Sequence, residues 1–140
     1  MLRFGLALLV ALFATFAISC GGDDVDVLEC EGECSCDVET NTCSCAGGTD
    51  CTLDGGEDVT FECDGNASCD LACDTGCHVI CPGTTGCTAL LADGSSADCQ
   101  GTATCEYECE GNCDIDCGSN TDCTTDCADD CEADGDSCIC

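Results

Sequence analysis

The chain has 140 residues, of which 30 are acidic and one is lysine or arginine, and its net charge is −29. This charge excludes nucleic acids and anionic membrane surfaces as electrostatic partners, because both require clustered basic residues. It favours cations or a basic protein surface instead. The chain also has 23 cysteines and few large apolar residues, so a small core must be held by covalent links.

The first 19 residues are predicted to be a secretory signal peptide. After Arg3, an apolar run from Phe4 to Ile18 carries no charge and is shorter than the about 20 residues of a bilayer span. The run ends in Ala17-Ile18-Ser19-Cys20, which resembles the lipobox of bacterial lipoprotein precursors. The resemblance implies that Cys20 becomes the mature N-terminus and carries lipid such as palmitate. In this family an aspartate directly after the lipidated cysteine retains the protein at the inner membrane. Gly21 stands there instead, so the resemblance implies the outer membrane or cell surface.

Cysteine parity favours lipidation of Cys20 over two alternatives, an ordinary signal peptide cut elsewhere and an uncleaved anchor. A thioether at Cys20 leaves 22 of the 23 cysteines, and these can all pair. Exported thiols form disulfides by default. Removal of residues 1–19 also removes Arg3, so the mature chain has no lysine or arginine and one histidine, His78.

The mature chain divides into four segments. Residues 20–29 are predicted to be an acidic tether, because their glycine and aspartate content disfavours packing. Residues 30–44 carry cysteines outside the regular spacing and are interpreted as a cysteine-rich N-terminal cap. Residues 45–134 are the repeat region, in which cysteines recur every 18 residues and part of the pattern recurs only after 36. Residues 135–140 are predicted to be a C-terminal cap. A short fixed period indicates one structural unit that is copied and stacked.

Each repeat is predicted to contribute two short strands. The five units are 45–62, 63–80, 81–98, 99–116 and 117–134, and each opens with two cysteines around a turn that carries glycine at 47, 65, 83 and 101 and serine at 119. Apolar and polar residues then alternate, which indicates half-buried strands. The expected inward residues are Leu53, Leu71, Ala89, Tyr107 and Thr125 in the first strand, and Phe61, Val79, Ala97 and Ile115 in the second.

These patterns predict an all-β protein, a small disulfide-laddered β-solenoid of about five 18-residue coils with loop-rich caps. Two alternatives are open. Cysteines four residues apart could form one stripe of a helix, although glycine, aspartate, threonine and asparagine are poor helix formers. The chain could also be a string of irregular disulfide loops.

The cysteine slots suggest how the thiols pair. A slot is a position that recurs in every unit. The slots of Cys73 and Cys77 either both hold cysteine or both lack it, and both neighbouring units lack it. The simplest inference is therefore pairing within coils: Cys73–Cys77, Cys109–Cys113 and Cys127–Cys131. The other two slots are filled in every unit and allow either pairing across a coil, as in Cys69–Cys81, or a favoured set of short loops. That set is Cys45–Cys51, Cys63–Cys69, Cys81–Cys87, Cys99–Cys105 and Cys117–Cys123, and it leaves six cap cysteines for three bonds of their own. Each short-loop bond contributes about 2 kcal/mol in the chain-entropy model.

The Cys-x5-Cys spacing within a unit is similar to that of the disulfide-laddered β-solenoid antifreeze proteins of insects. The resemblance covers only the repeat logic. Those proteins present a regular threonine ladder to ice, whereas the outward slots here are mixed (Thr52, Asp70, Thr88, Glu106 and Thr124), so ice binding is not implied.

No residue set indicates catalysis. Cys77 and His78 are neighbours, but neighbours in a strand point to opposite faces, and no nucleophile-elbow pattern surrounds any serine. The chain contains Cys-x-Cys steps like those of metallothioneins, for example Cys34-Ser35-Cys36, but it has no lysine to balance the charge of metal-bound thiolates. Stacked carboxylates are a better case, because oxygen ligands suit Ca²⁺. The candidates for a weak Ca²⁺ site are Glu62, Asp98, Asp114 and Asp116, and a solvated acidic surface is the simpler interpretation.

The sequence therefore predicts a non-enzymatic, acidic, cysteine-rich cell-envelope lipoprotein with a structural or adhesive role and no cofactor or small-molecule substrate. Its expected partners are the membrane, through the N-terminal lipid, and possible cations or a basic protein surface. Two alternatives are a Ca²⁺- or other cation-binding surface protein and a secreted inhibitor or toxin-like disulfide scaffold.

Overall fold

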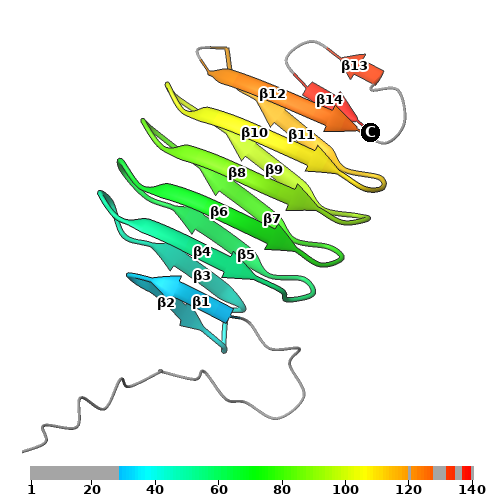
Figure 1. Ribbon diagram of the computed structural model, residues 1–140. Coiled ribbons are helices and arrows are strands. Elements are labelled where there is room, and N and C mark those ends of the chain that lie inside the picture. The colour runs from blue at the N-terminus through cyan, green and yellow to red at the C-terminus, as the bar shows by residue number, and fades with distance from the viewer. Residues whose placement is uncertain (1–28, 120, 128–131, 135–136, 140) are drawn as a thin grey trace, which may run out of the picture.

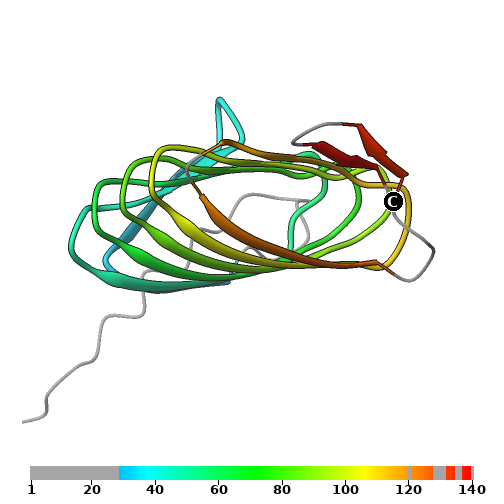
Figure 2. The same ribbon diagram turned by 90° about the horizontal axis from the view of Figure 1, so that it is seen from above.

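The computed structural model describes residues 29–119, 121–127, 132–134 and 137–139, and they form an all-β solenoid (Figure 1). The predicted signal peptide, the lipidation site Cys20 and the tether up to residue 28 lie outside the described residues. Seen from above, the stacked coils form a flattened ring with two sheets facing each other (Figure 2). The helical alternative is wrong, since every regular element in the described residues is a strand.

Two sheets make up the walls. Sheet A contains, in spatial order, β1 (Glu29–Gly32), β4 (Asp50–Asp54), β6 (Ser68–Cys73), β8 (Gly86–Leu91), β10 (Thr104–Cys109) and β12 (Asp122–Cys127). Sheet B contains β13 (Glu132–Asp134), β14 (Ser137–Ile139), β11 (Asp114–Cys117), β9 (Ser96–Cys99), β7 (His78–Cys81), β5 (Thr60–Cys63), β3 (Thr42–Cys45) and β2 (Cys34–Asp37). The chain alternates between the sheets from β3 to β12, so each coil supplies one strand to each sheet.

The register confirms the 18-residue coil. Cys69 lies opposite Cys87, and Cys87 lies opposite Cys105, in parallel pairs of sheet A. In sheet B, Val79 lies opposite Phe61 on one side and Ala97 on the other. Backbone hydrogen bonds also link the turns of successive coils, as in Ser68 N–H to the Thr49 carbonyl and Gly86 N–H to the Ala67 carbonyl, both to the coil before. Identical slots therefore stack at the strand spacing of about 4.8 Å.

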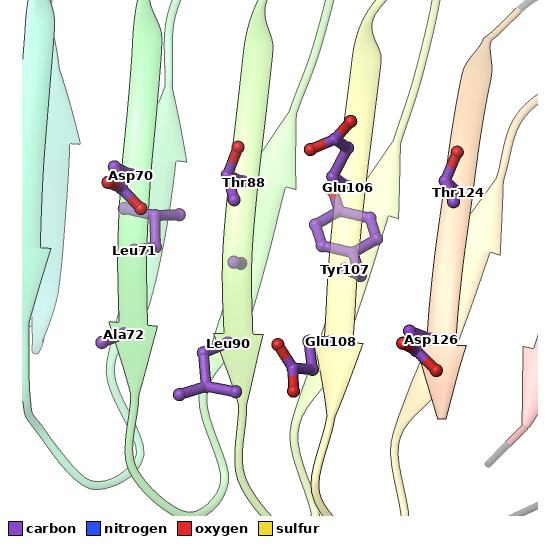
Figure 3. A pocket seen from close by; sticks show the side chains of 11 residues that line it. Asp70, Leu71, Ala72, Thr88, Leu90, Glu106, Tyr107, Glu108, Thr124 and Asp126 are labelled. Atoms are coloured by element: carbon purple, nitrogen blue, oxygen red, sulfur yellow. The ribbon is translucent and has the colours of Figure 1, made fainter. Parts of the chain in front are cut away.

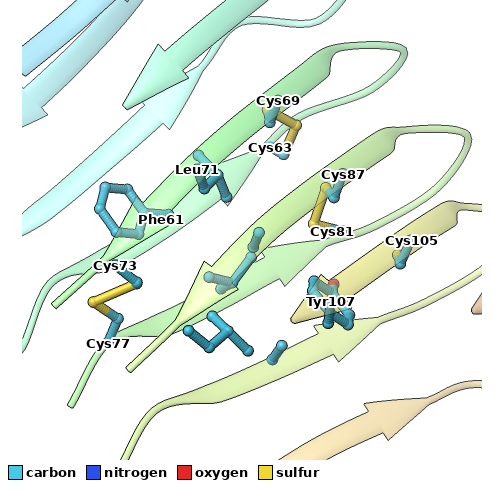
Figure 4. Close-up of a cluster of buried hydrophobic side chains, with 14 of the residues drawn as sticks. Phe61, Cys63, Cys69, Leu71, Cys73, Cys77, Cys81, Cys87, Cys105 and Tyr107 are labelled. Carbon is cyan, nitrogen blue, oxygen red and sulfur yellow. A yellow bond between two sulfur atoms is a disulfide. The ribbon is translucent and has the colours of Figure 1, made fainter. Parts of the chain in front are cut away.

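The core is the thin space between the two sheets (Figure 4). The inward residues predicted from the alternation are buried, with Thr125 in the last coil half-buried: Leu53, Leu71, Ala89, Tyr107, Phe61, Val79, Ala97 and Ile115. The strands show this directly, because buried and exposed residues alternate along β4, β6, β8 and β10. Each coil buries a few side chains, so a coil depends on its neighbours to complete its core.

Disulfides line both ends of this core. The first turn of each coil is closed by Cys45–Cys51, Cys63–Cys69, Cys81–Cys87, Cys99–Cys105 and Cys117–Cys123, the set favoured above. The second turn carries Cys73–Cys77 and Cys109–Cys113. Cys127 is also disulfide-bonded, and its predicted partner Cys131 lies outside the described residues. In the N-terminal cap the bonds are Cys30–Cys34 and Cys36–Cys43.

The third coil replaces its second disulfide by packing. Leu91 and Ser95 occupy the two cysteine slots and are both buried. The hydroxyl of Ser95 donates a hydrogen bond to the Asp74 carbonyl, at 3.3 Å, in the coil before. A leucine fills the volume of the missing sulfurs and the serine is satisfied, so the slot stays closed without a covalent bond.

The first turn of the coil needs glycine where the backbone has a positive φ. Gly65, Gly83 and Gly101 have φ values of 64°, 78° and 77°, a region that side chains with a Cβ avoid. A Cβ on Gly101 would also meet the Gly83 backbone oxygen at 3.0 Å. In the first unit the positive φ falls on Gly48, one residue after the expected Gly47.

The two ends of the stack differ from the unit boundaries predicted from the sequence. The strand β3 already pairs in parallel with β5, so the first coil begins at Thr42, inside the predicted 30–44 cap. At the other end, β13 occupies the chain position of the fifth unit's second strand but does not stack on β11. Instead β14 pairs with β11 in antiparallel fashion, and β13 pairs with β14. The cysteine position shared by Cys99 and Cys117 is not filled a further time, because residue 135 is glycine.

Candidate functional site: the acidic outer faces

The outward positions of sheet A form a row in which threonine and carboxylate alternate. Thr52, Asp70, Thr88, Glu106 and Thr124 stack directly on one another through β4, β6, β8, β10 and β12. Like charges directly opposite each other on neighbouring strands are destabilising. The alternation places Asp70 and Glu106 two strands apart, or about 9.6 Å, with the Thr88 hydroxyl between them. The alternation thus keeps this face acidic while it reduces the repulsion between carboxylates on neighbouring strands.

The carboxylates come closer in the last three coils. Glu108 lies directly opposite Asp126 in sheet A, and Asp98 lies directly opposite Asp116 in sheet B. Asp114 is on the same face of β11 as Asp116, two residues away. Neighbouring strands therefore bring like charges together where no threonine separates them.

The predicted Ca²⁺ ligands are not gathered into one site. Glu62 lies opposite Ile80, and Ile80 lies opposite Asp98, so an aliphatic side chain stands between the first carboxylate and the others. Among the described residues, no group of three or more histidine, cysteine, aspartate or glutamate side chains is arranged to hold a metal ion. The parallel register explains why these carboxylates do not meet. Each residue stacks on the one 18 positions along the chain, and for Glu62 that residue is Ile80.

His78 is on the outer face of sheet B, as expected, while Cys77 points inward and is bonded to Cys73. Its Nδ1 lies 2.8 Å from Ser96 Oγ, and its Nε2 lies 3.9 Å from Asp98 Oδ2, both on β9. This trio was not predicted from the sequence, although the 18-residue spacing of His78 and Ser96 indicates that these two side chains stack. The three groups lie on an open sheet, and the Ser96 N–H is already bonded to the Cys77 carbonyl. The Ser96 N–H is therefore not free to stabilise an oxyanion, the role that such donors have in acyl transfer.

Carboxylates in the turns act as hydrogen-bond acceptors. Asp93 Oδ1 accepts from the Asn112 backbone N–H at 3.0 Å and from its side-chain amide at 2.6 Å, across one coil spacing. These bonds, first the backbone and then the side-chain one, hold the pKa of Asp93 below its usual value. The charged form of this residue is thus part of the turn structure.

Among the described residues, one buried side-chain polar atom has no hydrogen-bond partner. The Tyr107 hydroxyl lies in the core, with the residue 2 % exposed, and accepts or donates no hydrogen bond. Burial, and secondly the charge of Asp98, raise the pKa of Tyr107 well above its ordinary value of 10.0. This phenol therefore stays neutral inside the protein.

No protein-family model, curated protein or solved structure matches this chain. In the part of the chain that the structure describes, no helix is long and apolar enough to cross a membrane.

Sequence reasoning missed the apolar residues on the outer faces. Leu90 and Ile80 occupy outward slots, where polar residues were expected, and Leu90 is 37 % exposed. The signal was present in the repeat alignment, because Leu90 stands in the slot of Glu108 and Asp126 and Ile80 in that of Asp98.

Proposed function

We propose that this protein is an exported, non-enzymatic cell-envelope lipoprotein whose solenoid has a structural or adhesive role at the bacterial surface. The observation that carries the proposal is the combination of a disulfide in the first turn of every coil with outer faces rich in carboxylates. The extensive disulfides indicate an exported or extracellular protein, since such bonds persist in oxidising compartments. The lipid anchor at Cys20 and the outer-membrane location rest on the lipobox-like sequence.

The fold suits a role in which a surface must keep its shape without a large core. Disulfides oppose unfolding locally, and the outward carboxylates can repel one another without opening the coils. Nine residues follow Cys20 up to the start of β1, and they span at most about 30 Å. A lipidated Cys20 would therefore hold the acidic solenoid close to the membrane, in reach of basic groups on a neighbouring surface.

The first test is the anchor. The full chain is expressed in a Gram-negative host, and its intact mass and its distribution between membrane and soluble fractions are measured beside Cys20→Ser. We expect the native chain to begin at Cys20 with added acyl mass and to sediment with membranes, and the variant to be released. A native chain that is soluble and cut elsewhere would refute the anchor and support the secreted inhibitor alternative.

The second test is adhesion. Cells that carry the native chain should adhere to an amine-coated surface more than cells that carry Cys20→Ser, because the variant leaves the cell. Adhesion should weaken with salt, as screening predicts, and should persist after chelation with EDTA. Loss of adhesion on chelation would favour the cation-binding alternative, and equal adhesion of both cell types would refute the adhesive role.

A further inference from the structure

The outer face of sheet A has a hollow of about 490 Å³ that crosses β6, β8, β10 and β12 (Figure 3). Its apolar part is Leu90 with Ala72 beside it in the register, and Thr88 lies on the same strand as Leu90. The hollow is part of the acidic face described above, but it differs from the rest of that face in offering an apolar surface.

Leu90 is placed where a partner would contact it. Its side chain lies between Ala72 and Glu108 on the outer face (Figure 3). The residue before it, Ala89, and the residue after it, Leu91, are inward and buried, so Leu90 contributes little to the core of the coil. Covering such an exposed leucine removes apolar surface from water and favours binding.

The rim of the hollow selects the charge of its occupant. Asp70 and Glu106 lie in the row of Thr88, and Glu108 and Asp126 lie in the row of Leu90, on the side away from Ala72. No basic side chain lines the hollow, and Arg3 is the one lysine or arginine of the whole chain. A second copy of this chain would bring more carboxylates to the same place, and so would be repelled.

We propose that this hollow docks a short cationic segment of a partner protein, with an apolar side chain over Leu90 and Ala72 and lysine or arginine side chains over the two pairs of carboxylates. The proposal rests on the adhesive role proposed above. It deepens that role by naming the face of the solenoid that binds and the chemistry of the partner. Four strands at about 4.8 Å spacing give a hollow about 14 Å across, which matches about four residues of extended peptide.

The test measures binding of fluorescein-labelled Lys-Lys-Leu-Leu-Lys-Lys amide to the full exported chain in detergent, by fluorescence anisotropy. A second peptide, in which the two leucines are serines, reports binding by charge alone. The hollow variant is Glu106→Gln with Glu108→Gln. The matched control is Glu62→Gln with Asp116→Asn, which removes the same charge from the outer face of sheet B. Leu90→Thr tests the apolar contact, because threonine already occupies the outward slot at Thr88 in the same strand.

The native chain should prefer the leucine peptide, and the hollow variant should weaken its binding about 10-fold, while the sheet B control changes it less than about 2-fold. Leu90→Thr should abolish the preference between the two peptides. Equal losses in both charge variants, or a preference that survives Leu90→Thr, would overturn the hollow as the site while leaving adhesion to amine surfaces intact. A change of sedimentation coefficient in Leu90→Thr would assign Leu90 to contact between copies of the chain and would also overturn the proposal. If adhesion fails while the leucine peptide still binds in the hollow, the proposed function is refuted and the site stands.

Discussion

Tyr107 gives a sharp test of the core, because it is the single tyrosine of a chain that has no lysine. Its hydroxyl is buried without a hydrogen-bond partner, and its pKa is raised in the folded state. Replacing it by phenylalanine removes the orphaned hydroxyl and leaves the ring in place. Because an unsatisfied buried polar group costs about 1–3 kcal/mol, we expect Tyr107→Phe to be as stable as the native chain or more stable at pH 7.

The pH dependence follows from the direction of the shift. A tyrosine whose folded pKa is raised contributes stability that is fully present below its unfolded pKa and is lost as the pH rises above that value. In the unfolded chain Tyr107 ionises near 10, while in the core it stays neutral. From pH 8 to pH 11, the free energy of unfolding should therefore fall by about 1.4 kcal/mol, and no lysine titrates in the same window to obscure it.

The assay is guanidinium unfolding at several pH values, followed by far-ultraviolet circular dichroism, with exposure at high pH kept brief to preserve the disulfides. The native chain should lose stability above pH 10, and Tyr107→Phe should not. Equal slopes in both proteins, or a clear destabilisation by Tyr107→Phe at pH 7, would refute the conclusion that the hydroxyl is buried and unpaired.

Three further predictions concern the coil. Leu71→Ala should destabilise the protein by about 2–5 kcal/mol, because it empties a buried slot, whereas Leu90→Ala should change stability by less than about 0.5 kcal/mol. Gly101→Ala should cost about 1–2 kcal/mol, because its φ of 77° disfavours a Cβ. Asn112→Ala should raise the pKa of Asp93 part of the way to its ordinary value, since the stronger backbone hydrogen bond remains, and the stabilisation that the charged Asp93 provides at neutral pH should then be lost at a higher pH on acidification.

Thermal and chemical unfolding check the first two predictions, and carboxyl NMR titration checks the third. Gly86→Ala is the matched control for Gly101, because its φ is not positive and a Cβ there would meet no atom within 4 Å. Equal costs at Gly86 and Gly101 would contradict the turn argument. An unchanged Asp93 titration in Asn112→Ala would show that the side-chain amide does not support the carboxylate.

The coil could be predicted because its signals repeat. A single strand such as β8 is six residues long and ambiguous on its own, but five copies in the same register make the inward slots unmistakable. The pairing of Cys73 with Cys77 also followed from comparison between coils, because neighbouring units lack both cysteines. Internal repetition thus supplied information that a single copy could not.

The ends and the surface could not be predicted in the same way. The antiparallel β14 has no counterpart in the repeat, so no comparison between coils could show that it displaces β13 from β11. The 18-residue spacing predicts that His78 stacks on Ser96, but it does not predict that the same imidazole also lies near Asp98, two residues further along β9. Leu90 brings a large apolar side chain to its outward position in a single coil, so the repetition that reveals the core does not reveal the hollow.

Each disulfide seen in the repeat begins and ends within one coil, which has a consequence for how such a chain can change in length. Duplication or deletion of whole 18-residue units leaves every remaining cysteine with its partner, so no free thiol arises. A change of 36 residues also preserves the alternation of threonine and carboxylate seen between Thr88 and Glu106. A protein of this design can therefore gain or lose two coils, about 9.6 Å of height, with every remaining disulfide and the outward alternation intact.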